Sequence, residues 1–521
     1  MEPTRVLSLI LFSPTLVALI MAFLPREEKT FLRWTALLGS LIPLGLTLAV
    51  WFGFDQGRTG FQYVENFVWY PTLNATYHLG LDGLSLSMVL LTTILTPIAI
   101  LASFNVEDAS KAYSVKAYMI LFLMLETGML GVFLSLDLLL FFVFWELGLV
   151  PMFFLINQWG SEKGEREVFG KKIPARQYAS YKFMIYTMAG SLGLLLAIQL
   201  IGVAANTYDL TQLYAIWPGM TDLKVPFGLD AALVKTIAFW AFALAFALKV
   251  PLWPFHTWLP DAHTEAPTAG SMILAGVLLK LGAYGFLRLV LPLYPVESQM
   301  YAPVLAFLAT MAIVFGALAA YGQTDFKRLV AYSSVNHMGF VVLGIAAAAA
   351  SLGKGEDAVI ALNGAVLQMF NHGLSAAGMF FLVGVIYERT HTRNLEEFGG
   401  LFPLVPVYGG ILIFTSMASL GLPGLNGFIS EFLVVRGSWP ILPLYIGLSM
   451  IGLFFTGAYI LKGIKKILHG PTNEKWIGHL TEINSREILV MAPLMVLILW
   501  IGVWPGWLLN TINSAMLMLF K

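Results

Sequence analysis

The stretch Ala247–Tyr284, ALKVPLWPFHTWLPDAHTEAPTAGSMILAGVLLKLGAY, decides how this chain is organised. It lies within a very apolar polypeptide, yet it contains two lysines (Lys249 and Lys280), two histidines, two carboxylates and several prolines. A lysine at bilayer depth costs roughly 2.5–3.5 kcal/mol even on mild insertion scales. Two lysines that flank a proline-broken helix are therefore expected to have a function, and this stretch is the predicted functional centre.

The composition excludes a soluble enzyme, because 58% of the 521 residues are hydrophobic and only 12% are charged. Apolar runs of about 20 residues recur from end to end, which is the signature of transmembrane helices. The balanced formal charge argues against a nucleic-acid partner. The absence of cysteine excludes disulfides, thiolate chemistry and cysteine-held iron–sulfur clusters. The apolar segment Val6–Leu24 lacks a convincing cleavage site, so we expect it to be the first spanning helix.

Apolar windows predict an all-α polytopic membrane protein with about fourteen spans, forming one integral membrane domain over residues 1–521. The expected spans are 6–24, 34–54, 85–104, 116–135, 138–157, 179–203, 231–262, 267–292, 302–322, 327–352, 358–387, 404–433, 440–466 and 487–509. Longer loops are expected at 55–79, 160–177 and 204–230.

Lysine and arginine predict the orientation, since cytoplasmic loops carry an excess of these residues. With fourteen spans, nearly all loop lysines and arginines lie on one side of the membrane. The opposite side holds only Arg58, Lys224, Lys354 and Arg436. We therefore expect the basic side to be cytoplasmic and both termini to be non-cytoplasmic.

Two expected spans are interrupted, span seven at Lys249-Val-Pro251 and span twelve at Gly421–Gly427. Broken helices at corresponding places in two halves are typical of inverted-repeat transporters. The breaks are five spans apart, and an odd offset turns the second copy over in the membrane. We expect two inverted five-helix repeats, at about 116–292 and 302–466.

Ionisable residues inside the expected spans are candidates for a proton path, because such residues usually face a bundle interior or a wet cavity. Lysine beside a carboxylate can switch between holding and releasing a proton, and histidine titrates near neutrality. The main candidates are Glu146, Lys249, Lys280, His337, His372 and Glu431. The alternatives are a structural ion pair for Glu146 and Lys249, and hydrogen-bonded core histidines for His337 and His372.

Three further residues are secondary candidates for proton transfer. Lys235 lies near the start of its span, where a lysine side chain reaches to the interface. Glu126 and Asp137 are expected close to span ends, as solvated or helix-capping residues.

A metal site at His256, Asp261 and His263 is a weak alternative. The pattern His-x4-Asp-x-His is not a standard zinc spacing, and it falls at a helix end by Pro260. We expect no metal, and we expect both histidines to be structural or to lie at the rim of the proton path.

Several motifs closely resemble the antiporter-like membrane subunits of respiratory complex I and of Mrp antiporters. They are the segment Lys249–Lys280, GLDGLS (Gly80–Ser85), LLLFFVFWE (Leu138–Glu146), DFKRLVAYSSVNHMGF (Asp325–Phe340) and Asn371–Gly400. The resemblance covers nearly the whole chain and is strongest to the M-type branch, which is chain 4 in mitochondria and the D-type in photosynthetic NDH.

The resemblance implies a role for each candidate. Glu146 and Lys249 match a pair that modulates proton release, and Lys280 matches the central connecting lysine. His337 and His372 match the later histidines of the path. Glu431 matches the terminal position of helix twelve, where the M-type has glutamate and the L-type and N-type relatives have lysine. The chain also ends soon after span fourteen, without the lateral helix of the L-type.

The function that the resemblance implies is that of a proton-translocating membrane-arm subunit of a complex I-type NADH:quinone oxidoreductase. Its expected partners are the L-type and N-type subunits and small membrane subunits, together with lipid, in an inner (plasma) or thylakoid membrane. NADH or ferredoxin, FMN, iron–sulfur clusters and quinone are expected in partner subunits, with no redox site in this chain. The alternatives are a subunit of an Mrp-type Na+/H+ antiporter, and a structural spacer whose buried charges only hold helices together.

Overall fold

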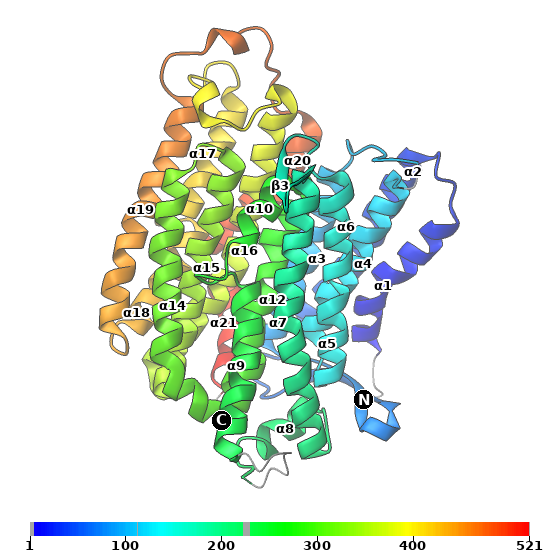
Figure 1. Cartoon of the computed structure of the whole chain (residues 1–521), viewed down its shortest axis with the longest axis vertical. Helices are drawn as coiled ribbons and strands as arrows, with labels where there is room; N and C mark the ends of the chain where they lie inside the picture. The colour runs from blue at the N-terminus through cyan, green and yellow to red at the C-terminus, as the bar shows by residue number, and fades with distance from the viewer. Residues whose placement is uncertain (1–4, 112, 222–229, 520–521) are drawn as a thin grey trace.

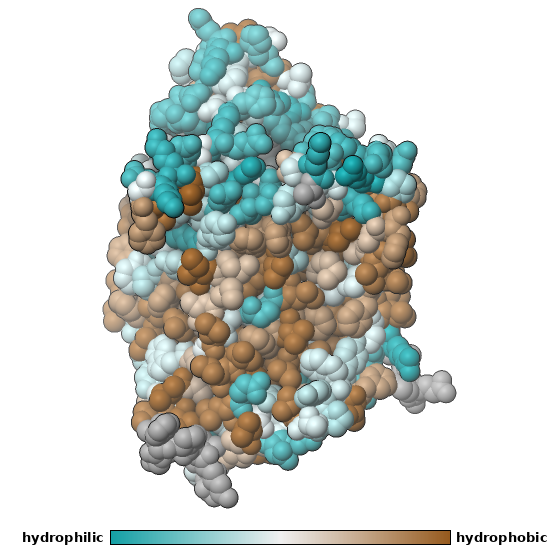
Figure 2. All heavy atoms as spheres, turned by 45° about the vertical axis from the view of Figure 1, so that its right-hand side comes forward, coloured by the Kyte–Doolittle hydropathy of each residue, from teal (hydrophilic) through white to brown (hydrophobic). Residues whose placement is uncertain are grey.

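The structure is a computed structural model that describes residues 5–111, 113–221 and 230–519. The helices run roughly parallel in one bundle, with α1 and α2 at one edge and α19 at the other (Figure 1). In Figure 2 hydrophobic side chains form a broad band across the middle of the visible face, and hydrophilic side chains gather above this band. This distribution is the one expected of a protein that spans a membrane.

Thirteen helical segments of the described chain are long and apolar enough to cross a membrane. Nine of them are each a single helix: α1 (Val6–Phe23), α2 (Lys29–Gly53), α3 (Gly83–Ala102), α4 (Val115–Leu134), α7 (Ala175–Ala205), α9 (Ala231–Lys249), α14 (Pro295–Gly322), α19 (Pro443–Leu468) and α20 (Ser485–Val503). Two more are the central helices α15 (Phe326–Ser351) and α16 (Glu356–Thr390).

The two remaining spans are composite. The segment Leu138–Trp159 consists of α5 (Leu138–Leu147) and α6 (Leu149–Trp159). The segment Thr268–Leu293 consists of α11 (Thr268–Ile273), α12 (Leu279–Gly285) and α13 (Leu291–Leu293), joined by the π-helical turns Leu274–Leu278 and Phe286–Val290. Such π-helical turns occur often at functional sites.

The expected span that is not among these thirteen is span twelve, which is broken. Its halves α17 (Pro406–Leu420) and α18 (Asn426–Ser438) are each too short to cross a bilayer alone. Gly421 and Gly424 between them have φ angles of +84° and +94°, a backbone conformation that favours glycine. Span seven is broken as expected, because α9 ends at Lys249 and α10 (Trp258–Glu265) follows only after Pro251.

Two small β-hairpins and some short helices differ from the expectation of plain loops. β1 (Gln62–Tyr70) pairs with β2 (Ala75–Leu81), and β3 (Glu165–Val168) pairs with β4 (Lys171–Pro174), both antiparallel. α8 (Leu210–Ile216) lies in the loop expected at 204–230, whose residues 222–229, including Lys224, are outside the described residues. The last span ends at Val503 rather than near 509, because Pro505 separates it from α21 (Gly506–Met516).

Polar residues at helix starts explain several of these boundaries. Asp82, Asp137 and Asp325 are the N-caps of α3, α5 and α15, and each carboxylate accepts a backbone N–H from the first turn of its helix. Such caps satisfy backbone donors that the helix itself leaves unpaired.

Burial separates an inner group of helices from an outer one. The most apolar stretches of Thr268–Leu293 and of α16 are entirely buried, and that of α15 is 94% buried, whereas those of α19 and α20 are only 33% buried. The outer helices therefore expose apolar side chains on the outside of the bundle. Charged and polar residues on the inner helices are enclosed by protein, and these helices hold the candidate site.

Candidate functional site

Lys280 lies at the centre of the bundle, on α12 directly after the first π-helical turn. Its side chain is fully buried. The ammonium donates to the carbonyl of Ala275 and lies 2.8 Å from Nδ1 of His372 on α16. The structure therefore brings together two of the predicted residues, and the π-helical turn supplies a carbonyl that helps to hold a charge inside the protein.

His337 and Glu431 form a second pair. Nδ1 of His337 on α15 lies 2.6 Å from Oε1 of Glu431 on α18, and both side chains are buried. The rings of His337 and His372 are 5.7 Å apart between centroids, so the two pairs are neighbours. Oε2 of Glu431 points toward the break between α17 and α18, where a Cβ at Gly421 would lie 3.7 Å away.

Two residues that the sequence analysis missed complete this second pair. Gln368 donates its amide to Oε1 of Glu431 at 2.9 Å, and Tyr459 on α19 places its hydroxyl 3.3 Å from Nε2 of His337. Gln368 lies one helical turn before His372, and this spacing was a signal that could have revealed it. Tyr459 has no such signal, because only the packing of α19 brings it to the site.

Lys249 and Glu146 behave differently from the expected ion pair. Lys249 is 2% exposed, and its ammonium has no hydrogen-bond partner among the described residues. Oε1 of Glu146 is also buried without a partner, and among the described residues no ion pair joins Glu146 to Lys249. The ammonium instead lies 4.9 Å from the ring centroid of Trp145.

The end of α9 packs closely against α12, which places Lys249 beside the helix that carries Lys280. A Cβ added at Gly282 would lie 3.0 Å from Cβ of Lys249 and 2.7 Å from the carbonyl oxygen of Phe246. Glycine at this position therefore permits a contact that any larger residue would prevent.

The three secondary candidates lie apart from this cluster. Lys235 is 9% exposed, donates to the carbonyl of Pro218 at 2.9 Å and lies over the ring of Trp217. Asp137 caps α5 as expected, but it is buried rather than solvated because it also accepts the backbone N–H of Thr76. The expectation for Glu126 is wrong: it lies in the middle of α4, fully buried, with neither carboxylate oxygen partnered among the described residues.

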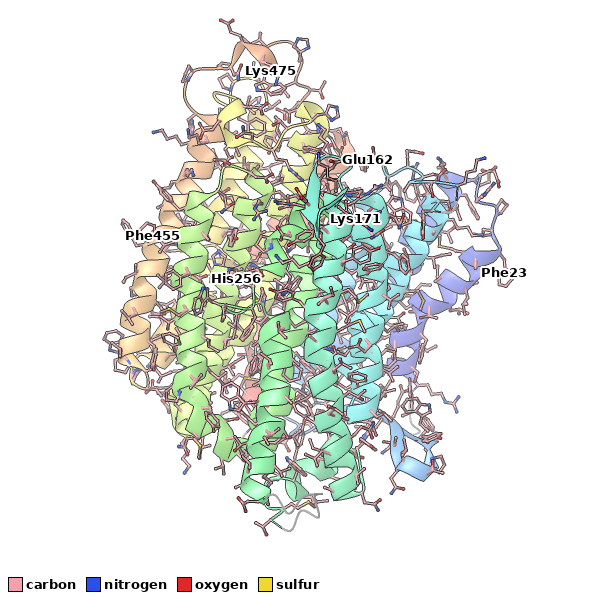
Figure 3. The ribbon with its side chains drawn as sticks, in the orientation of Figure 1. Phe23, Glu162, Lys171, His256, Phe455 and Lys475 are labelled. Carbon is pink, nitrogen blue, oxygen red and sulfur yellow. The ribbon has the colours of Figure 1, made fainter. Side chains whose placement is uncertain are left out.

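The alternative metal residues do not converge. Asp261 forms ion pairs with Lys182 at 2.7 Å and Arg328 at 3.1 Å, while His263 is buried and stacks on Phe380 at 4.3 Å. His263 is therefore an interior residue rather than a rim residue. His256 lies about half-way along the bundle in Figure 3, whereas Lys475 lies at its upper end in that view. No group of three metal-binding side chains occurs in the described ranges.

A buried ion pair outside the path anchors the opposite end of the eighth span. Arg288 donates to Asp82 at 2.6 Å and to the hydroxyl of Tyr284 at 3.1 Å. Burial opposes the ionised carboxyl of Asp82, but the field and hydrogen bond of Arg288 outweigh it and hold the pKa below its usual value. Together with Thr211 and Tyr214, this pair lines a surface cavity of about 480 Å³.

The comparisons with known proteins agree with this architecture. The family model of the NADH:quinone oxidoreductase/Mrp antiporter transmembrane region matches residues 135–456. The chain is 38% identical to NADH-quinone oxidoreductase subunit M of Rhodobacter capsulatus over 516 residues, covering 98% of this chain and 95% of that one.

Two solved structures have the same fold. A chain of respiratory complex I from Thermus thermophilus matches with a TM-score of 0.82 and 26% identity, over 99% of this chain and 100% of that chain. A chain of the Mrp complex from Dietzia sp. matches with a TM-score of 0.80 and 24% identity, over 98% of this chain and 52% of that chain, which shows the fold alone. The chain therefore belongs to the NADH:quinone oxidoreductase/Mrp antiporter transmembrane family, as its motifs indicated.

Proposed function

We propose that this protein is a proton-translocating membrane-arm subunit of a complex I-type NADH:quinone oxidoreductase. The likeness to a subunit M over nearly the full length of both chains supports this function. We assign the redox chemistry of NADH or ferredoxin, FMN, iron–sulfur clusters and quinone to partner subunits. The partners are other membrane-arm subunits, including L-type and N-type antiporter-like chains.

One observation carries the proposal: buried titratable groups follow one another from Lys280 to Glu431. Lys280 contacts His372 at 2.8 Å, the His372 and His337 rings are 5.7 Å apart, and His337 contacts Glu431 at 2.6 Å. The first and last of these contacts are within hydrogen-bond distance, and the two histidine rings between them are neighbours. Ionisable groups are expensive inside a membrane and are retained where protons or ions move.

The proposed sequence of events begins at Glu146 and Lys249. A change of charge elsewhere in the membrane arm alters the interaction of these two residues and thereby the tendency of Lys249 to release its proton. The proton passes to Lys280, then through His372 and His337 to Glu431, which releases it outward. Water fills the distance between Lys249 and Lys280.

The orientation, the repeats and the membrane are further parts of this proposal. We assign the lysine- and arginine-rich end to the cytoplasmic side and both termini to the other side, in an inner (plasma) or thylakoid membrane. The two helix breaks, each next to a buried charged residue (Lys249 and Glu431), support inverted repeats over about 116–292 and 302–466.

Substitution of Lys249 or Glu146 by alanine tests the function. We expect Lys249→Ala and Glu146→Ala each to lower the number of protons translocated per NADH oxidised in membrane vesicles, while the complex still assembles. Lys462→Ala is the matched control, because the ammonium of Lys462 donates to the carbonyl oxygens of Tyr321 and Gln323, away from the path. An unchanged proton-to-electron ratio in either test variant would favour the structural-spacer alternative and overturn the proposal.

A further inference from the structure

The ammonium of Lys249 has an aromatic ring where a carboxylate was expected. It lies 4.9 Å from the centroid of the Trp145 ring, and it has no hydrogen-bond partner among the described residues. A cation within about 6 Å of an indole face is attracted by the ring quadrupole, and the attraction is stronger where water is excluded. Both side chains are only 2% exposed, so the contact between Lys249 and Trp145 is a desolvated one.

The Trp145 ring is held in place from several sides. Its Nε1 donates to the hydroxyl of Ser191 on α7 at 3.0 Å. It stacks on Phe141, one turn earlier on α5, at 5.8 Å, and it meets the edge of Phe246 at 5.4 Å. Phe246 lies one turn before Lys249 on α9. A ring with these contacts gives the lysine a fixed position.

Glu146 competes for the same ammonium from the adjacent position of α5. Consecutive side chains on a helix point about 100° apart, so Lys249 can contact either the ring of Trp145 or the carboxylate of Glu146, but not both well. In the structure the lysine lies on the ring and Oε1 of Glu146 is without a partner.

We propose that Trp145 is a positioning residue of the proton path, whose ring holds protonated Lys249 apart from Glu146 and keeps the pair open until a coupling signal closes it. This inference rests on the proposed function. The ring attracts an ammonium but has no comparable attraction for a neutral amine, so Lys249 is released from it when it gives up its proton. Protonated Lys249 therefore has two positions, on the ring or beside the carboxylate of Glu146, and the ring stabilises the open arrangement of the pair.

Trp145→Leu and Trp145→Phe in the assembled complex distinguish this role from simple packing. We measure protons translocated per NADH oxidised in membrane vesicles as a function of pH. Phe144→Leu is the control, since Phe144 is a buried aromatic residue of the same helix that packs against Gly131 and Phe12 instead of Lys249. Lys249→Ala is measured in parallel as the test of the proposed function itself.

In Trp145→Leu we expect the ratio to fall at least twofold and its alkaline decline to move to higher pH by roughly half a unit to one and a half units, because protonated Lys249 then pairs with Glu146, whose carboxylate favours the charged lysine. Trp145→Phe keeps an aromatic face and is expected to retain most of the ratio. An equal loss at every pH, or equal loss in the leucine and phenylalanine variants, would overturn the positioning role. If Lys249→Ala also leaves the ratio unchanged, the proposed function fails with it.

Discussion

Two substitutions of Glu431 distinguish the role of its hydrogen bonds from its ability to carry a proton. In Glu431→Ala, His337 and the amide of Gln368 lose their shared acceptor inside the protein. Each buried polar group left without a partner costs about 1–3 kcal/mol, so the variant is expected to lose about 2–6 kcal/mol of stability. Glu431→Gln keeps the shape and an acceptor oxygen, and its expected loss is about 1 kcal/mol.

The two variants therefore differ in stability but share a functional defect. The amide of Glu431→Gln does not titrate, so we expect normal assembly and quinone reduction with fewer protons translocated per electron. The assays are the amount of assembled complex in membranes, its thermal unfolding midpoint, and the proton-to-electron ratio in vesicles. A wild-type ratio in Glu431→Gln would refute the relay role. Equal unfolding midpoints for the two variants would refute the hydrogen-bond reasoning.

Three more outcomes are expected from other parts of the structure. Gly282→Ala places a Cβ against the end of α9 and is expected to lower stability by about 1–3 kcal/mol and to reduce proton translocation, as measured by thermal unfolding and vesicle assays. Asp82→Asn leaves Arg288 buried without a counter-charge and is expected to cost about 3–5 kcal/mol, measured as loss of assembled complex. Burial opposes the charge of Asp209, but hydrogen bonds, led by the one with His78, lower the pKa of the Asp209 carboxyl. The contribution of Asp209 to stability is therefore complete above about pH 3.9 and is lost as the pH falls through the lower pKa of the folded protein, which acid unfolding measures.

Each of these predictions has its own control. Gly447→Ala adds a Cβ with nothing within 4 Å and is expected to leave stability unchanged or slightly higher. The double variant Asp82→Asn/Arg288→Met removes both charges and is expected to recover much of the loss; no recovery would contradict the ion-pair reasoning. His78→Phe is expected to reduce the acid sensitivity that Asp209 contributes, and an unchanged acid midpoint would contradict it.

The sequence alone determined which segments cross the membrane and which residues are too costly to be there by chance. Hydropathy is a property of a short window, and the cost of a buried lysine does not depend on its partner, so both can be evaluated without a fold. The interruption at Lys249–Pro251 and the glycines after Leu420 were equally local signals. For this reason the two broken spans were predicted close to where the structure has them.

Only the tertiary structure decided which of these residues contact one another. Lys280 and His372 are 92 residues apart, and His337 and Glu431 are 94 apart, so their contacts depend on how helices rotate and pack. The hydropathy of a segment does not show how its helix is rotated about its own axis. The same limit applies to the burial of Glu126, which follows from how α4 packs among its neighbours, whereas its mid-span position was already implied by the expected span 116–135.

Lys249 shows the difference most clearly. The sequence marked it as a functional lysine because it ends a broken helix in an apolar environment, and it named Glu146 as the partner. The packing of α5 against α9 brings the ring of Trp145 to the ammonium instead. Adjacent positions on one helix have nearly the same place in the sequence but point in different directions, and only the orientation of the folded helix selects between them.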